Sequence, residues 1–84
     1  MTQPKIVMYV RDDCYDVDLA RTVLQNKRLV WQEIDIESDS AARAQVVEWT
    51  GRAATPTIWV GDHMLVEPGP MELAHAVETA SVAV

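Results

Sequence analysis

Cys14 is the side chain of this sequence best suited to chemistry, because a cysteine thiolate attacks disulfides. It lies in the charged stretch RDDCYDVD, where Arg11 favours the thiolate and four nearby carboxylates oppose it: Asp12, Asp13, Asp16 and Asp18. The chain has no other cysteine and cannot form an internal disulfide. Exchange at Cys14 would therefore need a thiol from another molecule.

The position of Cys14 bears on two open interpretations. A lone cysteine is often a small buried hydrophobic residue without a chemical role. Cys14, however, follows a short apolar run and precedes a helical pattern, so we expect it in the turn between a strand and a helix. That position favours solvent access, and the helix dipole there favours a thiolate.

Size and charge limit the classes of function. A chain of 84 residues predicts a single domain over residues 1–84. The net charge of −6, with only seven Lys and Arg, argues against nucleic acid and anionic membranes as partners. The apolar run 6–10 is too short for a membrane span or a signal peptide. A chain without structural disulfides fits a reducing compartment, so we expect a cytoplasmic location.

The first half of the chain predicts two strand–helix pairs. A strand is expected over Lys5 to Val10, and a helix follows within residues 12–28. That helix has one apolar face, Val17, Ala20, Val23 and Leu24. Asp12 or Asp13 is expected to cap its start, with Asp16 and Asp18 in its first turn and Lys27 and Arg28 in its last turn.

A second strand is expected over Val30 to Ile36, and the next helix lies within residues 38–51. Ser38 or Ser40 is its expected cap and Gly51 its end.

The second half of the chain has a different pattern of apolar residues. Two short apolar runs, Thr57 to Val60 and Met64 to Val66, predict an antiparallel hairpin. Pro70 is expected at the start of a third helix, whose apolar side comprises Leu73, Ala76, Val77 and Ala80. The order β-α-β-α-β-β-α predicts an α/β fold with a four-stranded mixed sheet flanked by helices.

Several stretches carry a family resemblance. IVMYVRDDC, WQEIDI and TGRAATPTIWVGD, with a cysteine in the first turn and a proline before the third strand, resemble the glutaredoxins of the thioredoxin fold. The ending LVEPGPMEL is similar to the actinobacterial mycoredoxin branch. The glutaredoxin motif C-x-x-C or C-x-x-S corresponds here to CYDV, a monothiol form with Val17 in the second position.

The resemblance implies a function and a site. The function would be monothiol thiol–disulfide exchange with Cys14 as nucleophile, glutathione or another low-molecular-weight thiol as co-substrate, and mixed-disulfide proteins as substrates. No tightly bound cofactor is implied. Arg11 and Arg52 would hold a carboxylate of the small thiol, and the position of Arg52 is one that in relatives helps hold the glycyl carboxylate of glutathione. Thr55 and Pro56 match the residue before a cis-proline and that proline, where the backbone pairs with the bound thiol. Tyr15, next to the thiol, is expected among the substrate-binding residues, where it would cover the thiol or pack against the protein body.

Some positions depart from the family pattern. Asp16 replaces the aromatic third motif residue, and Pro68 to Met71 replace the Gly-Gly-Ser-Asp anchor for the γ-glutamyl end. Glu67 precedes a proline, where the amino-terminal domains of glutathione transferases carry a Glu-Ser pair. These departures leave a second class of function open, a redox-inactive module that binds a partner in the groove near Cys14 and Pro56.

Structural interpretations also apply to the other candidates. Arg11 and Arg52 would serve as surface partners of the many carboxylates, and Pro56 as a turn residue. Trp31, Trp49 and Trp59 fall on periodic positions typical of core or half-buried residues. His63 and His75 have no partner at metal-ligand spacing, so no metal site is expected.

Overall fold

The computed structural model describes residues 3–82 and contains four strands and three helices. They are β1 (Ile6–Val10), α1 (Tyr15–Asn26), β2 (Gln32–Asp35), α2 (Ser40–Thr50), β3 (Thr57–Val60), β4 (His63–Val66) and α3 (Pro70–Val82). The predicted element order and mixed α/β fold are confirmed.

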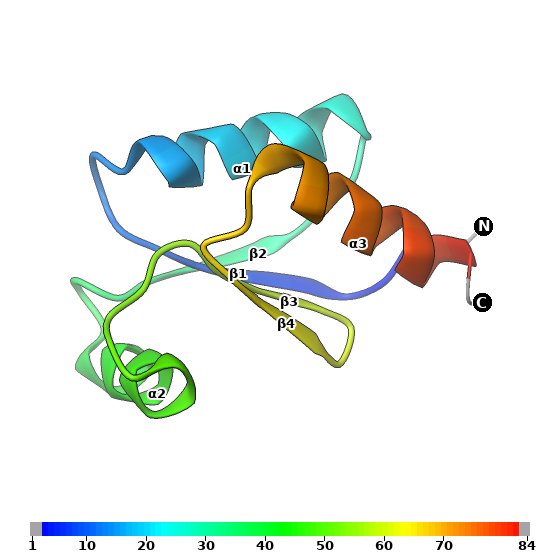
Figure 1. Cartoon of the computed structure of the whole chain (residues 1–84). Helices are drawn as coiled ribbons and strands as arrows, with labels where there is room; N and C mark the ends of the chain where they lie inside the picture. The colour runs from blue at the N-terminus through cyan, green and yellow to red at the C-terminus, as the bar shows by residue number, and fades with distance from the viewer. Residues whose placement is uncertain (1–2, 83–84) are drawn as a thin grey trace.

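The four strands form one mixed sheet in the order β2-β1-β3-β4. β1 pairs with β2 in parallel and with β3 antiparallel, and β4 completes the predicted hairpin. Figure 1 shows α1 and α3 together over one face of the sheet and α2 on the opposite face. In the β1–β3 register Tyr9 pairs with Thr57. The segment that leads into β3 is thereby brought to the end of β1, where α1 begins.

The main core lies between the sheet and the helix pair α1 and α3. β1 alternates, so that Ile6, Met8 and Val10 are buried and the residues between them are half-buried. The helices contribute their predicted apolar faces, with Val17, Ala20, Leu24, Leu73 and Val77 buried. This packing fixes the start of α1 against the centre of the sheet.

Aromatic side chains join α2 to the other side of the sheet. The rings of Tyr9 and Trp49 meet edge to face with centroids 5.4 Å apart, and Trp49 meets Trp59 in the same way at 5.3 Å. This is a favoured arrangement of aromatic pairs. Trp31, Trp49 and Trp59 are all half-buried, as predicted, although Trp31 lies just before β2 and not within a strand.

The ends of α1 differ from the prediction. Its N-cap is Cys14, in an extended conformation, and not Asp12 or Asp13, which lie in the preceding turn. The helix ends at Asn26, so Lys27 and Arg28 are outside its last turn. Lys27 is the C-cap, and its ammonium pairs with Glu78 of α3. The Lys27 charge thus serves a contact between α1 and α3, whereas the sequence predicts it in the last turn of α1.

Other boundaries also shift. Asp39 caps α2 by accepting a hydrogen bond from the Ala42 N–H at 2.9 Å, so the prediction of Ser38 or Ser40 is wrong. An aspartate carboxylate is an equally strong capping group. The second strand is shorter than predicted, because Val30 and Trp31 precede it. Gly51 ends α2 with φ of 87°, and Pro70 begins α3, both as predicted.

Candidate functional site

Cys14 lies between the end of β1 and the first turn of α1. The residue is half-buried and has the extended backbone of an N-cap, with φ −111° and ψ 112°. Its side chain forms no capping hydrogen bond with the helix. The sulfur is therefore held at the positive end of the helix dipole without being used to complete the helix.

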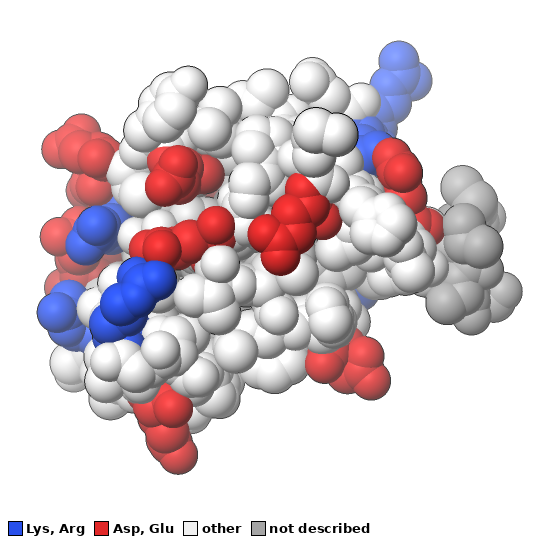
Figure 2. Space-filling view, in the orientation of Figure 1, with Lys and Arg blue, Asp and Glu red and all other residues white. Residues whose placement is uncertain are grey.

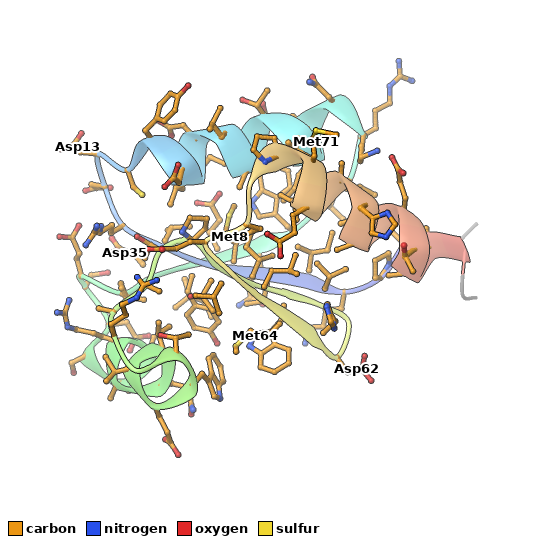
Figure 3. The ribbon with its side chains drawn as sticks, viewed as in Figure 1. Met8, Asp13, Asp35, Asp62, Met64 and Met71 are labelled. Atoms are coloured by element: carbon orange, nitrogen blue, oxygen red, sulfur yellow. The ribbon has the colours of Figure 1, made fainter. Side chains whose placement is uncertain are left out.

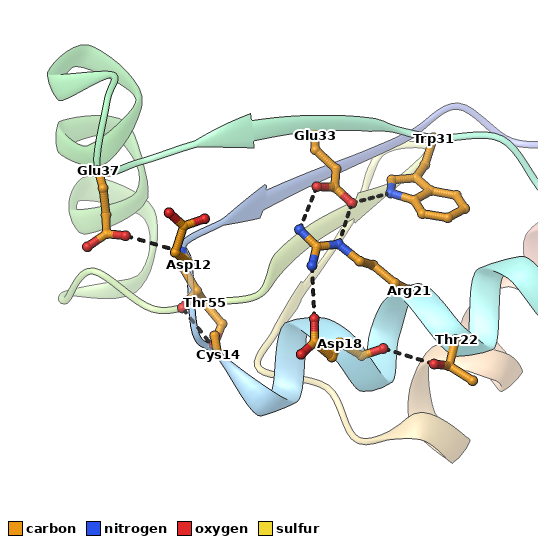
Figure 4. A network of polar contacts seen from close by, with 9 residues as sticks. All are labelled: Asp12, Cys14, Asp18, Arg21, Thr22, Trp31, Glu33, Glu37 and Thr55. Carbon is orange, nitrogen blue, oxygen red and sulfur yellow. Dashed lines mark hydrogen bonds and ion pairs between the residues drawn. The ribbon is translucent and has the colours of Figure 1, made fainter.

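Thr55 is the residue that contacts the sulfur from the other side (Figure 4). Its hydroxyl donates to Cys14 Sγ at 3.6 Å, and the thiol can donate to the Thr55 carbonyl at 3.7 Å. Thr55 is 2% exposed, and the Thr55–Pro56 peptide bond is cis. The hydroxyl contact is the one that a thiolate keeps, because a thiolate has no proton to donate.

The segment around Thr55 is firmly held. Ala54, Pro56 and Thr57 are buried, and the Thr57 hydroxyl donates to the Ala54 carbonyl at 2.8 Å. Among the hydrogen bonds of residues 3–82, none is donated by the Thr55 N–H. The structure thus brings Cys14 and Thr55 together next to Pro56 and leaves the Thr55 N–H without a partner among the described residues.

Arg52 and Glu67 form an ion pair beside the same segment. Arg52 Nη1 and Nη2 each donate to one oxygen of the Glu67 carboxylate at 2.8 Å. Glu67 directly follows β4 with φ of 48°, and its N–H donates to the Pro56 carbonyl at 2.8 Å. The hydrogen bonds from Arg52, and to a smaller degree the charge of Arg11, lower the pKa of Glu67. The sequence singles out both residues but does not predict their pairing, because 15 positions separate them and no periodic pattern joins them.

Arg11 and Tyr15 are the most open of the predicted site residues. Arg11 is exposed, and its charge makes a small contribution to lowering the pKa of Glu67. Tyr15 is 74% exposed, so most of its surface is open to solvent. Figure 2 shows basic and acidic side chains next to each other along one edge of the molecule.

The aspartates around Cys14 do not act as one cluster. Asp12, Asp13 and Asp16 are exposed, where salt screens their charge. The charge of Asp18 is paired with that of Arg21, which donates to its carboxylate at 2.9 Å. The opposition to a thiolate is thus weaker than four unpaired carboxylates would produce.

Comparison with known proteins identifies the family. Residues 6–65 match the sequence profile of the glutaredoxins, and a glutaredoxin of Pseudomonas aeruginosa is 30% identical over 77 residues, which cover 92% of this chain and 88% of that one. The chain belongs to the glutaredoxin family.

Solved structures share the fold of this glutaredoxin. The solution structure of glutaredoxin from Brucella melitensis gives a TM-score of 0.71 at 23% identity, and covers 99% of this chain and 88% of that one. A crystal structure of a thioredoxin-like protein gives 0.76 at 22% identity, over 86% of this chain and 99% of that one.

Family membership supports a function in thiol–disulfide exchange and favours it over a redox-inactive binding module. Glutaredoxins commonly use glutathione as co-substrate, and their substrates are small thiols and disulfides. In this member the second motif position is Val17, which is fully buried in the main core. Its side chain therefore has a packing role in the core, next to the turn that holds Cys14.

One cleft among the described residues lies away from the Cys14 site. It measures about 520 Å³ and lies between the β3–β4 hairpin and α3, where its lining includes His63, Leu65 and His75. Figure 3 shows Asp62 of that hairpin and Asp13 of the Cys14 loop at opposite ends of the molecule. We assign the site by the sulfur and its partners, since none of them lines this cleft.

Within residues 3–82, no three side chains of His, Cys, Asp or Glu are grouped to bind a metal ion. Nor does any helix in that range combine the length and apolar character needed to cross a membrane.

Proposed function

We propose that this glutaredoxin exchanges mixed disulfides by a monothiol route, with Cys14 as nucleophile and glutathione or a similar small thiol as co-substrate. The observation that carries the proposal is the contact of the Cys14 sulfur with Thr55. A thiol at a helix N-cap, with a buried hydroxyl donating to it, has an environment suited to a reactive thiolate.

The reaction has two balanced steps. Cys14 loses its proton to solvent, and its thiolate attacks the small-thiol sulfur of a mixed disulfide. A disulfide then joins Cys14 to the small thiol, and the protein thiolate leaves and takes a proton from solvent. A second small thiol, as its thiolate, attacks the small-thiol sulfur bound to Cys14. The products are a small disulfide and free Cys14, so the small thiol supplies the reducing electrons.

The neighbouring residues fit a small peptide-like thiol. The free N–H of Thr55 would pair with the backbone of the bound thiol, with Pro56 fixing the direction of that segment. Arg11 would attract a carboxylate of the ligand, and exposed Tyr15 would cover its other side.

The proposed partners are small thiols and proteins that carry them as mixed disulfides. A route that consumes a reduced small thiol needs a reducing environment, so we propose the cytoplasm as the location. The acidic surface, with a net charge of −6, gives no support for nucleic-acid or membrane partners.

The test follows transfer of glutathione from a glutathionylated peptide by mass spectrometry. We expect a Cys14–glutathione adduct and release of the peptide thiol, and added glutathione should then remove the adduct. Cys14→Ser should form no adduct and release no peptide above the uncatalysed rate.

Asp62→Ser is the matched control, because it introduces the same residue in the exposed hairpin turn at the far end of the molecule. It should exchange like the unmodified protein. Exchange that survived Cys14→Ser, or an unmodified protein that formed no adduct, would refute the proposed function.

A further inference from the structure

Arg52 already binds a carboxylate, and that carboxylate belongs to the chain itself. Both terminal nitrogens of its guanidinium donate to the two oxygens of Glu67. This is the paired geometry in which an arginine would bind the carboxylate of a ligand. A ligand carboxylate must therefore displace Glu67 before it can use Arg52 in this way.

The backbone of Glu67 keeps its carboxylate next to Arg52. Its N–H donates to the Pro56 carbonyl, which ties the end of β4 to the segment that contacts Cys14. Its φ of 48° and the following Pro68 restrict the turn in which it lies. The carboxylate thus acts as a tethered competitor with a high local concentration at Arg52.

The pair also removes a positive charge from the surface that a ligand of Cys14 would contact. Arg52 is neutralised by Glu67, whereas Arg11 takes part in none of the four ion pairs found within residues 3–82. The loop before α1 adds the exposed carboxylates of Asp12 and Asp13. Of these two arginines, only Arg11 therefore remains available to a ligand carboxylate, and the carboxylates of Asp12 and Asp13 lie next to it in the chain.

We propose that Glu67 is a specificity residue that occupies the carboxylate position at Arg52 and selects small thiols that carry no free carboxylate at that end. The preferred non-protein half of the mixed disulfide is then neutral or cationic where it faces Arg52. This inference rests on the proposed function for its role in exchange, but the ligand preference itself is a binding property.

Two ligands that differ in one carboxylate test the preference. S-methylglutathione and its glycyl ethyl ester cannot exchange disulfides, so their binding reports recognition at the Cys14 site without any redox step. We expect the unmodified protein to bind the ester at least as well as the acid in an NMR titration. Glu67→Gln should shift the acid-to-ester affinity ratio toward the acid by about two- to fivefold, the range expected for an exposed ion pair.

Glu48→Gln is the matched control, because it removes the same charge from an exposed position on α2, the helix that precedes Arg52. It should leave the ratio unchanged. The double variant Arg52→Gln, Glu67→Gln should not show the shift toward the acid, since the arginine that would bind the ligand carboxylate is then also absent.

A clear preference of the unmodified protein for the acid would overturn the inference, as would a ratio that Glu67→Gln does not move, including the case in which neither ligand binds. Failure of the proposed function gives a different result, the absence of a Cys14 adduct in the transfer assay. The two failures are thus separate observations.

Discussion

Two regions at α1 use the same kind of ion pair with different outcomes. On the outer face of the helix, Arg21 donates through Nε and Nη2 to the two oxygens of Glu33, both at 2.9 Å. Glu33 also accepts from Trp31 Nε1, and Arg21 reaches Asp18 (Figure 4). We call these four residues the outer network. At the start of the helix, Arg52 and Glu67 form a single pair beside Cys14.

The two regions differ in how completely their polar groups are used. The outer network joins α1 to β2, and the side chains of Arg21 and Glu33 are 36% and 28% exposed. The Arg52 and Glu67 side chains are 58% and 36% exposed and have no third partner among the described residues. A satisfied, partly buried network stabilises the fold, whereas an exposed isolated pair contributes little and can be displaced. The comparison teaches that bidentate geometry alone does not separate a structural pair from one that faces a ligand.

The largest predicted effect concerns the sulfur contact at the reactive end. Thr55→Val keeps the shape of this buried side chain but removes the hydroxyl that donates to Cys14 Sγ. We expect the rate of Cys14 alkylation by iodoacetamide at neutral pH to fall about tenfold, which corresponds to about 1.4 kcal/mol for one hydrogen bond to a charged group.

Thr57→Val is the control for that variant, because Thr57 is equally buried but its hydroxyl donates to the Ala54 carbonyl. It should lower the free energy of unfolding and leave the alkylation rate within twofold of the original. Equal alkylation rates for Thr55→Val and the unmodified protein would show that the sulfur contact has no kinetic role.

Sequence patterns predicted the parts of this fold that depend on local chemistry. The apolar face of α1, the left-handed Gly51 and the start of α3 at Pro70 each follow from residue type and spacing, and all are confirmed. Cys14 was predicted at the turn before α1 for the same reason. The cis bond before Pro56 came from the family resemblance and not from a local pattern, and it too is confirmed.

The features that sequence patterns missed depend on partners far apart in the chain. Lys27 lies 51 positions from Glu78, and Cys14 lies 41 positions from Thr55. Periodicity reports which face of an element is buried, but it does not say which charged side chains meet once the faces have packed. The predicted N-cap residues of α1 and α2 were wrong for a related reason. Several polar residues near each helix start were able to cap, and tertiary packing determined which residue held the N-cap conformation.

A smaller effect is expected from breaking the outer network. Arg21→Met keeps much of the apolar stem but leaves Glu33 without its guanidinium partner. We expect the free energy of unfolding, measured with urea, to fall by about 1 kcal/mol. Cys14 alkylation should not change. Arg43→Met is the control, since Arg43 is exposed on α2 and belongs to none of the ion pairs within residues 3–82. Loss of alkylation in Arg21→Met without loss of stability would contradict the separation of the two regions.

The smallest predicted effect is a difference in acid sensitivity between the two glutamates. The hydrogen bonds from Arg21, and then that from Trp31, lower the pKa of Glu33 below its ordinary value of 4.5, and Arg52 lowers that of Glu67. When the pKa of a glutamate is lower in the folded state than in the unfolded state, the unfolded state binds more protons at pH values between these two pKa values. The stabilisation is therefore complete above about pH 4.5 and is lost as the pH falls through the folded pKa.

Glu33→Gln should flatten the pH dependence of stability in that acid window by about 0.5 kcal/mol, because Glu33 is the less exposed of the two. Glu67→Gln should change it less, and that small change should vanish in high salt, which screens exposed pairs. Thermal unfolding between about pH 3 and pH 6, at low and high salt, measures both. If Glu67→Gln instead had the larger, salt-insensitive effect, the pair beside Cys14 would be part of the structural framework, and its displacement by a ligand carboxylate would cost too much for the selectivity that we infer.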